Sequence, residues 1–261
     1  TVGTCFSLYV HGDIKVSSTG KLYVATNEGI VYRTTANMTL DDEGLIESTM
    51  LRTSMAAGTH MGSLTINGGT FILTGNDPGK GDFPTFGLTY SNSSFNMSGG
   101  ELIINRGTRT GNAECHALVI GSNPDNCSIT GGTVKLPCAN WNGNNKRVYI
   151  NSTVPLWNLE IEADATANTV TIMGFDNHGN GGCEDVPISS LVVLNNLTIS
   201  NRGTLNANGQ NVYVGGNFTI NNTATYTPGN NTTIFNGSSV QNFTNSGTVT
   251  NGLNNLTLAE N

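Results

Sequence analysis

The feature that most constrains this chain is a repeated unit of strand, Gly-Gly and strand. Within each unit apolar and polar residues alternate, so Leu64 and Ile66 share one face of a strand and Thr65 lies on the other. A glycine pair permits a sharp bend, since glycine adopts positive φ without strain. Three copies align without gaps, with starts 31 and 32 residues apart by subtraction: 64–73 (LTINGGTFIL), 95–104 (FNMSGGELII) and 127–136 (CSITGGTVKL).

Repeats of this length indicate a stacked architecture, because one unit is too small to bury its own apolar face. We therefore predict an all-β fold, a parallel β-helix (solenoid) with loop insertions at the rung corners. Four segments interrupt the strand pattern and are the expected insertions: 74–90, 105–116, 137–147 and 174–187. The alternative is a β-sandwich, in which each Gly-Gly forms a two-residue hairpin turn.

The spacing of the repeats suggests two regions within one continuous solenoid. Residues 1–147 are expected to form loop-decorated rungs, with weaker copies of the unit upstream of residue 64. Residues 148–261 are expected to form shorter, regular rungs, since LTI at 197–199 and FTI at 218–220 lie 21 residues apart.

Composition excludes several classes of partner. Charged residues make up only 11% of the chain, the net charge is −7, and the few Lys and Arg are scattered singly. Nucleic acid is not an expected partner, because phosphate binding needs a basic footprint. A membrane-spanning segment is not expected either, since no apolar run approaches the roughly 20 residues that a transmembrane helix needs.

The two ends of the sequence suggest a fragment of a longer protein. The chain opens with TVGTC, without a basic stretch or an initiating Met, and closes with LTLAEN in the middle of a strand-like pattern. No signal peptide is recognisable in this opening.

The five cysteines show no C-x-x-C pair, so the spacing of a zinc site is absent. Cys127 and Cys138 bracket one repeat unit. A disulfide between them, or one with Cys115, is expected if the protein is secreted. The alternative is that these cysteines are buried free thiols, because a free cysteine is commonly buried.

From residue 148 onward the sequence shows a more specific pattern. Its rungs contain an aromatic-Asn-Leu strand at 157–161 (WNLEI), a turn and strand at 208–219 (NGQNVYVGGNFT), and the segment 234–241 (IFNGSSVQ). This part of the chain resembles the giant repeat-containing cell-surface adhesins of gliding Bacteroidota, which are exported by type IX secretion. The first half shares only the general rung pattern with them.

The resemblance implies a location and a set of partners. It implies export across the outer membrane, display at the extracellular cell surface, participation in gliding motility, and contact with extracellular surfaces or polysaccharides. It also implies contact with the outer-membrane secretion or gliding machinery, and a segment held as cargo by that machinery is an alternative role. The complete family members carry a signal peptide and a C-terminal sorting domain, neither of which is recognisable in this sequence.

The enzymatic alternative is a β-helix polysaccharide lyase or hydrolase. Such an enzyme needs carboxylates gathered on one face beside a basic residue or calcium. The acidic residues here are dispersed, and the one three-residue acidic run, Asp41-Asp42-Glu43, is interpreted as a solvated turn before Gly44. We therefore expect no enzyme activity and assign no catalytic residue.

One segment has the oxygen-bearing residues of a calcium loop. Asp176 and Asn180 begin it, and Asp185 is an alternative to the bidentate Glu that closes an EF-type loop, because position twelve is Pro187. Calcium is the one candidate cofactor, and a Gly-rich surface loop tethered by Cys183 is the alternative interpretation.

The polar residues suggest how the rungs are joined and what they contact. Asn residues recur at the expected corners, where stacked amides form hydrogen-bonded ladders. The leading functional hypothesis is an adhesive stalk whose corner loops contact surfaces or glycans. The aromatic residues expected near those loops are Phe83, Phe86, Trp141 and Trp157.

Overall fold

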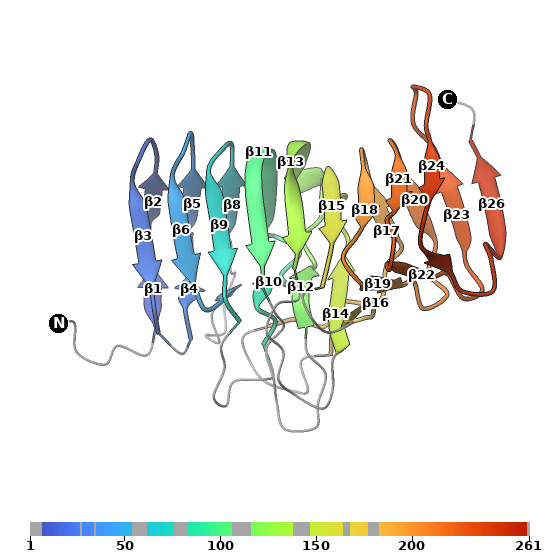
Figure 1. Cartoon of the computed structure of the whole chain (residues 1–261). Helices are drawn as coiled ribbons and strands as arrows, with labels where there is room; N and C mark the ends of the chain where they lie inside the picture. Colours follow the sequence, from blue (N-terminus) through green and yellow to red (C-terminus); the bar gives the residue numbers. More distant parts are fainter. Residues whose placement is uncertain are drawn as a thin grey trace.

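The alternating segments form strands that stack in parallel along one axis (Figure 1). The structure is a computed structural model, and it describes residues 7–26, 28–33, 35–53, 62–75, 83–105, 116–137, 147–163, 168–176 and 183–259. Within these residues the fold is all-β, apart from the single 3-10 turn η1 (Pro124–Asn126). No helix among them is long and apolar enough to cross a membrane.

The described strands form three sheets, and neighbours within a sheet come from successive passes of the chain. Sheet A contains, in spatial order, β1 (Leu8–Val10), β4 (Ile30–Tyr32), β7 (Leu51–Thr53), β10 (Phe86–Leu88), β12 (His116–Ile120), β14 (Arg147–Ser152), β16 (Asn168–Ile172), β19 (Gly203–Asn206), β22 (Thr225–Thr227) and β25 (Thr248–Val249).

Sheet B has two rows of short strands that merge in its middle. The first row is β2 (Asp13–Val16), β5 (Asn37–Leu40) and β8 (Ser63–Ile66), and the second is β3 (Lys21–Val24), β6 (Leu45–Ser48) and β9 (Thr70–Leu73). Both rows join β11 (Ser94–Ile104), and the sheet continues through β13 (Ser128–Leu136), β15 (Asn158–Ile161), β18 (Leu197–Ile199), β21 (Phe218–Ile220) and β24 (Phe243–Asn245). Sheet C consists of β17 (Leu191–Val193), β20 (Val212–Val214), β23 (Thr232–Phe235) and β26 (Asn255–Leu258).

The alternative, a β-sandwich with a hairpin at each Gly-Gly, is wrong for these units. The two strands of a unit do not pair with each other: β8 pairs with the first part of β11, and β9 pairs with its second part. All pairs between the described strands are parallel, and the one antiparallel bridge, between Phe175 and Val186, lies outside them. The long parallel sheets are consistent with stacked rungs.

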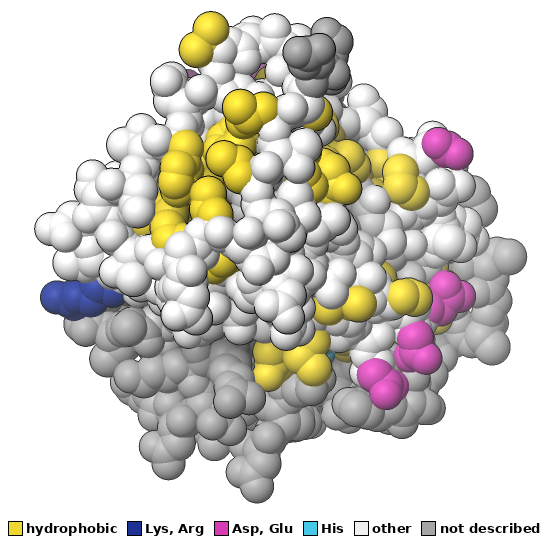
Figure 2. Space-filling view, turned by 90° about the vertical axis from the view of Figure 1, so that its right-hand side faces the viewer, with side chains coloured by type: hydrophobic (Ala, Val, Ile, Leu, Met, Phe, Trp, Pro, Cys, Tyr) yellow, Lys and Arg dark blue, Asp and Glu magenta, His cyan; other side chains and the backbone are white. Residues whose placement is uncertain are grey.

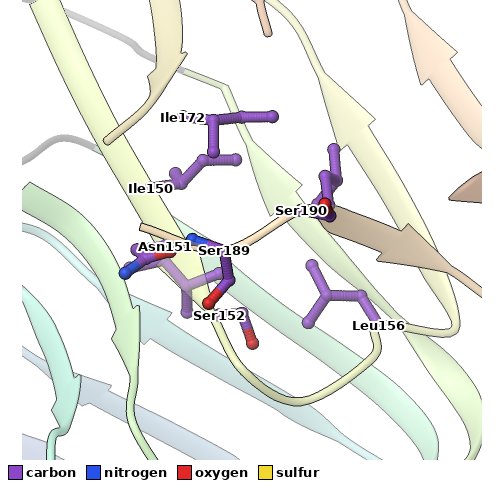
Figure 3. A pocket seen from close by; sticks show the side chains of 9 residues that line it. Ile150, Asn151, Ser152, Leu156, Ile172, Ser189 and Ser190 are labelled. Carbon is purple, nitrogen blue, oxygen red and sulfur yellow. Dashed lines mark hydrogen bonds between the residues drawn. The ribbon is translucent and has the colours of Figure 1, made fainter. Parts of the chain in front are cut away.

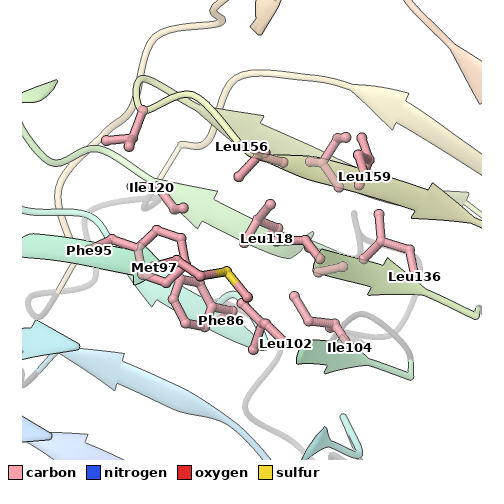
Figure 4. Packing of buried hydrophobic residues seen from close by; sticks show 14 of the residues in the cluster. Phe86, Phe95, Met97, Leu102, Ile104, Leu118, Ile120, Leu136, Leu156 and Leu159 are labelled. Carbon is pink, nitrogen blue, oxygen red and sulfur yellow. The ribbon is translucent and has the colours of Figure 1, made fainter. Parts of the chain in front are cut away.

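The predicted faces of the repeat units are confirmed. Leu64, Ile66 and Phe95 are fully buried, whereas Thr65 between them faces outward and is partly exposed. Figure 4 shows apolar side chains of β10, β11, β12, β13 and β15 pointing toward one another between the sheets. Burying each such side chain contributes about 1.5–3 kcal/mol, so the stack of rungs supplies one continuous core.

Glycine is required where each unit bends, because the bends stack directly on one another. Gly69 and Gly100 have φ of 67° and 69°. A Cβ on Gly69 would lie 2.3 Å from the carbonyl oxygen of Gly44, and one on Gly100 would lie 2.5 Å from that of Gly68. Any larger residue would separate the rungs at this corner.

The spacing of paired residues varies along sheet A. Successive partners lie 22, 21, 35, 32, 32 and 22 residues apart along the series Leu8, Ile30, Leu51, Phe86, Leu118, Ile150 and Ile172. Further on, Asn168 pairs with Gly203 at an offset of 35, and Thr204 pairs with Thr225 at an offset of 21. Short rungs thus occur near both ends of the sheet, and long rungs occur on both sides of residue 147, where the sequence suggested a change of rung length. Sheet A continues across that position without a break.

The asparagine ladders expected at the rung corners are present. The side-chain oxygen of Asn158 accepts the backbone N–H of Asn196 at 3.1 Å. That of Asn196 accepts the N–H of Asn217, and that of Asn217 accepts the N–H of Asn242, both at 2.9 Å. Each rung therefore caps the backbone of the next one at the corner before sheet B.

The last rung leaves apolar side chains uncovered, and Figure 2 shows them gathered on that end of the molecule. Leu256 and Leu258 are 53% and 73% exposed, although their partners Thr233 and Phe235 in the preceding rung are buried. Phe243 of β24 is 40% exposed. These side chains form an apolar surface at this end of the described residues.

The ladder is testable at its most connected position. Asn158→Ala removes the acceptor for the Asn196 N–H and the donor to the Gly132 carbonyl, which lies 3.0 Å away. We expect the free energy of unfolding to fall by about 1–3 kcal/mol, because partly buried backbone groups lose their partners. Asn158→Asp keeps the acceptor and should cost less. Asn222→Ala, at an exposed turn, is the control and should change stability by less than about 0.5 kcal/mol in denaturant titrations.

Candidate functional site

A groove lies at the corner where β3, β6 and β9 end and the chain turns toward sheet A. Its accessible volume is about 250 Å³. The same three rungs supply its lining, which consists of Tyr23, Val24, Ala25, Thr26, Glu47, Ser48, Thr49 and Thr74. The stacking of rungs thus brings together residues that lie about one turn of the chain apart.

The groove offers an aromatic ring beside acceptor oxygens. Tyr23 and Glu47 are paired residues of β3 and β6, and the Tyr23 residue is 58% exposed. The Thr49 hydroxyl donates to the carbonyl of Thr26, and the Thr74 hydroxyl donates to that of Ser48 at 3.4 Å. Because those hydroxyl protons are already used, the groove presents mainly acceptors. It suits a ligand that carries several hydroxyl donors and an apolar face.

A second feature is a strap, residues 183–190, which crosses the outer face of sheet A along the axis. The N–H of Glu184 donates to the Thr89 hydroxyl after β10, at 3.1 Å. Further along the strap, the Asn151 side chain on β14 donates to the carbonyls of Val186 and Pro187 and accepts the N–H of Ser189, at 2.9–3.0 Å. The strap therefore ties together rungs that are far apart in sequence.

A buried ion pair lies close to Cys183, the first residue of the strap. Arg52 of β7 is 2% exposed, and its guanidinium lies 2.8 Å from the Glu28 carboxylate and 4.3 Å from the centre of the Phe83 ring. The Ser7 hydroxyl donates to the same carboxylate at 2.7 Å. A buried charge is tolerated only where it is paired and hydrogen-bonded, so these contacts are what permits an arginine on this face.

Cys183 lies against the same cluster and is 4% exposed. Burial raises the pKa of its thiol to about 12, even though Thr89, Arg52 and Thr53 oppose the shift. The thiol is therefore neutral at physiological pH, which makes it a poor nucleophile and a poor metal ligand.

Beneath the strap, a small cavity lies between Ser189, Ser190 and the strands below (Figure 3). Its apolar lining consists of Leu118, Ile150, Leu156, Ile172 and Leu191, and its accessible volume is about 10 Å³. That space suffices for about one water molecule. It cannot admit a substrate.

The calcium prediction is only partly covered by the structure. Asp176 and Asp185 are exposed and flank the antiparallel bridge between Phe175 and Val186, while Asn180 lies outside the described residues. Within the part of the chain that the structure describes, no group of three or more His, Cys, Asp or Glu side chains could hold a metal ion. Calcium binding at this loop stays a prediction.

The disulfide prediction is likewise open. Cys127 is a half-buried free thiol whose sulfur accepts the N–H of Phe95 at 3.3 Å. Burial raises the pKa of this thiol. Cys115 and Cys138 lie outside the described residues.

The acidic run forms a turn, as predicted. Asp42 is exposed with φ of 54°, and Glu43 is also exposed. Lys15 lies 2.7 Å from Asp41, and its hydrogen bond, together with one from Asn67, lowers the pKa of the Asp41 carboxyl. This carboxylate is a structural link between rungs.

The aromatic residues expected at contact loops are placed differently. Phe83 is 4% exposed and Phe86 is fully buried, because Phe83 covers Arg52 and Phe86 points into the core. Trp157 is partly exposed, and Trp141 lies outside the described residues. Sequence reasoning missed Tyr23, although the alternation of Leu22, Tyr23 and Val24 places the tyrosine on the outer face.

Comparisons with known proteins give no relative for this chain. No protein-family model matches it, no curated protein matches it, and no solved structure matches it. A role for this chain must therefore be argued from its parallel sheets and its groove.

The strap can be tested through the reactivity of Cys183. Asn151→Ala removes three hydrogen bonds to the strap, so we expect iodoacetamide to modify Cys183 faster than in the unaltered protein. Peptide-resolved mass spectrometry measures the rate at neutral pH, where the raised pKa keeps the native thiol protonated. Asn254→Ala also removes one rung-to-rung hydrogen bond, but near the opposite end, and should leave the rate unchanged. Equal rates for all three proteins would contradict a closing role for the strap.

Proposed function

We propose that the chain is a parallel β-helix segment of a secreted cell-surface adhesin or structural stalk, and that its groove binds surface glycans. The β-helix assignment is supported by the order of the strands, since each pass of the chain adds one strand to sheet A. The number of stacked rungs would determine how far the segment extends, and the groove would make the contact with glycans.

The observation that carries the glycan proposal is the pairing of an exposed aromatic ring with acceptor oxygens. A sugar has apolar C–H faces that stack on aromatic rings, and equatorial hydroxyls that donate to such oxygens. Tyr23 would receive the sugar face, while Glu47 and Thr49 would accept its hydroxyls. No proton transfer is required, so the proposed role is binding without catalysis.

The cellular setting is proposed from the sequence pattern. The rungs between residues 148 and 261 resemble those of type IX-secreted adhesins of gliding Bacteroidota, which supports export and display at the outer surface. Low charge and a polar, Asn- and Thr-rich exterior suit a protein that works outside the cell.

The glycan proposal predicts a specific loss on changing the tyrosine. Tyr23→Ala should abolish retention on an array of bacterial and host polysaccharides, because the stacking surface is lost. Glu47→Gln keeps the shape of the groove and should weaken binding less. Tyr9→Ala is the matched control, since Tyr9 is 45% exposed but lies on sheet A outside the groove. Unchanged retention for Tyr23→Ala would rule out this groove as the site.

A further inference from the structure

The outer face of sheet A carries two parallel rows of side chains across β16, β19, β22 and β25. Each strand contributes a Thr-x-Thr segment, and in-register pairing places the first threonines in one row and the second ones in the other. In one segment Asn stands in place of the second threonine. The first row is Thr169, Thr204, Thr225 and Thr248, and the second is Thr171, Asn206, Thr227 and Thr250. We call this set the threonine array.

The array is held rigidly from below. The residue between the two rows points inward on each strand, and Val170, Leu205 and Tyr226 are fully buried in the core. Threonine is β-branched, so few χ1 rotamers are open to it. Neighbouring strands are about 4.7–4.9 Å apart, and residues two apart on one strand are about 6.6 Å apart. Apart from Asn206, the array is therefore a regular lattice of hydroxyl and methyl groups.

The hydroxyls of the first row are available to a ligand. Thr169, Thr204 and Thr225 are partly exposed, and Thr248 is exposed. Their side chains make no hydrogen bond to another described residue, unlike Thr49, Thr74 and Thr153 elsewhere in the rungs. In the second row, Thr171 is buried, and the hydroxyls of Thr227 and Thr250 lie 3.2 Å apart.

The face is also free of charge and of outward aromatic rings over these strands. Their sequences, NTVTI, GTLN, TYT and TV, contain no Asp, Glu, Lys or Arg, and the one aromatic residue, Tyr226, points into the core. An ionic ligand would find no partner there, and a sugar ring would find no stacking surface such as Tyr23 provides in the groove.

We propose that the threonine array binds the surface of crystalline water, that is, ice. A ligand for this face must be uncharged and must itself repeat at a few ångströms in two directions, so that many weak hydrogen bonds form at once. An ice surface has both properties. A rigid array loses little conformational entropy on binding, so each weak contact contributes to the binding free energy. This site is separate from the glycan groove and does not depend on it.

The test compares ice shaping by the whole chain and its variants. In a nanolitre osmometer the unaltered protein should facet ice crystals and separate their melting and freezing temperatures, and it should slow ice recrystallisation. Thr225→Lys, at the centre of the first row, should reduce both activities to the buffer level, because a long charged side chain lifts the lattice off the face. Thr219→Lys is the matched control, since Thr219 is a partly exposed threonine in the same rungs but belongs to sheet B.

The outcomes separate cleanly. Circular dichroism melting should show that both lysine variants fold, and Thr225→Val, which keeps the shape of the side chain, provides a second variant if Thr225→Lys does not. Absence of ice shaping by the unaltered protein would overturn the proposal, as would equal losses in the two lysine variants. Thr225-dependent sedimentation with insoluble cellulose or chitin, without ice shaping, would assign the array to a polysaccharide surface and would also overturn it.

Discussion

Everything in this molecule depends on the register between successive rungs. Parallel pairing places one inward apolar residue above another on successive passes, as in the buried series Met38, Leu64 and Phe95 on sheet B. A shift by one residue would turn each of these side chains to solvent, because the side-chain period of a strand is two. The glycine bends and asparagine ladders act at the corners, where the strand pattern alone specifies register least.

Once register is fixed, the rungs tolerate very different lengths. Offsets between paired residues range from 21 to 35 along sheet A, yet the sheet is continuous. The added residues lie between strands, where the cost of lengthening a loop grows slowly. One of these additions, the strap, folds back over sheet A, where it is hydrogen-bonded to Thr89 and Asn151. Insertions here add structure to the outside without altering the core.

The same regularity produces the two proposed binding surfaces. At the corner after β3, β6 and β9, stacking brings Tyr23, Glu47 and three threonines into one groove. On sheet A, stacking turns a Thr-x-Thr pattern into a lattice. The groove is irregular and includes a carboxylate, which suits a discrete hydroxylated ligand. The array is uncharged and repeats from strand to strand, which suits an extended ligand.

The sequence by itself determined the strands of the Gly-Gly units, their faces and the turn at Asp41-Asp42-Glu43, because these follow from local alternation and from glycine placement. The insertion predicted at 74–90 was too long, because Phe86–Leu88 within it form strand β10 of sheet A. Only the tertiary structure decided that the strands pair in parallel between units, because a Gly-Gly bend is compatible with a hairpin until the partner strand is known. The tertiary structure likewise decided that Phe83 and Phe86 are buried and that Tyr23 lines a groove. Those facts depend on which residues of other rungs lie above and below, and that is a long-range property that no single repeat unit contains.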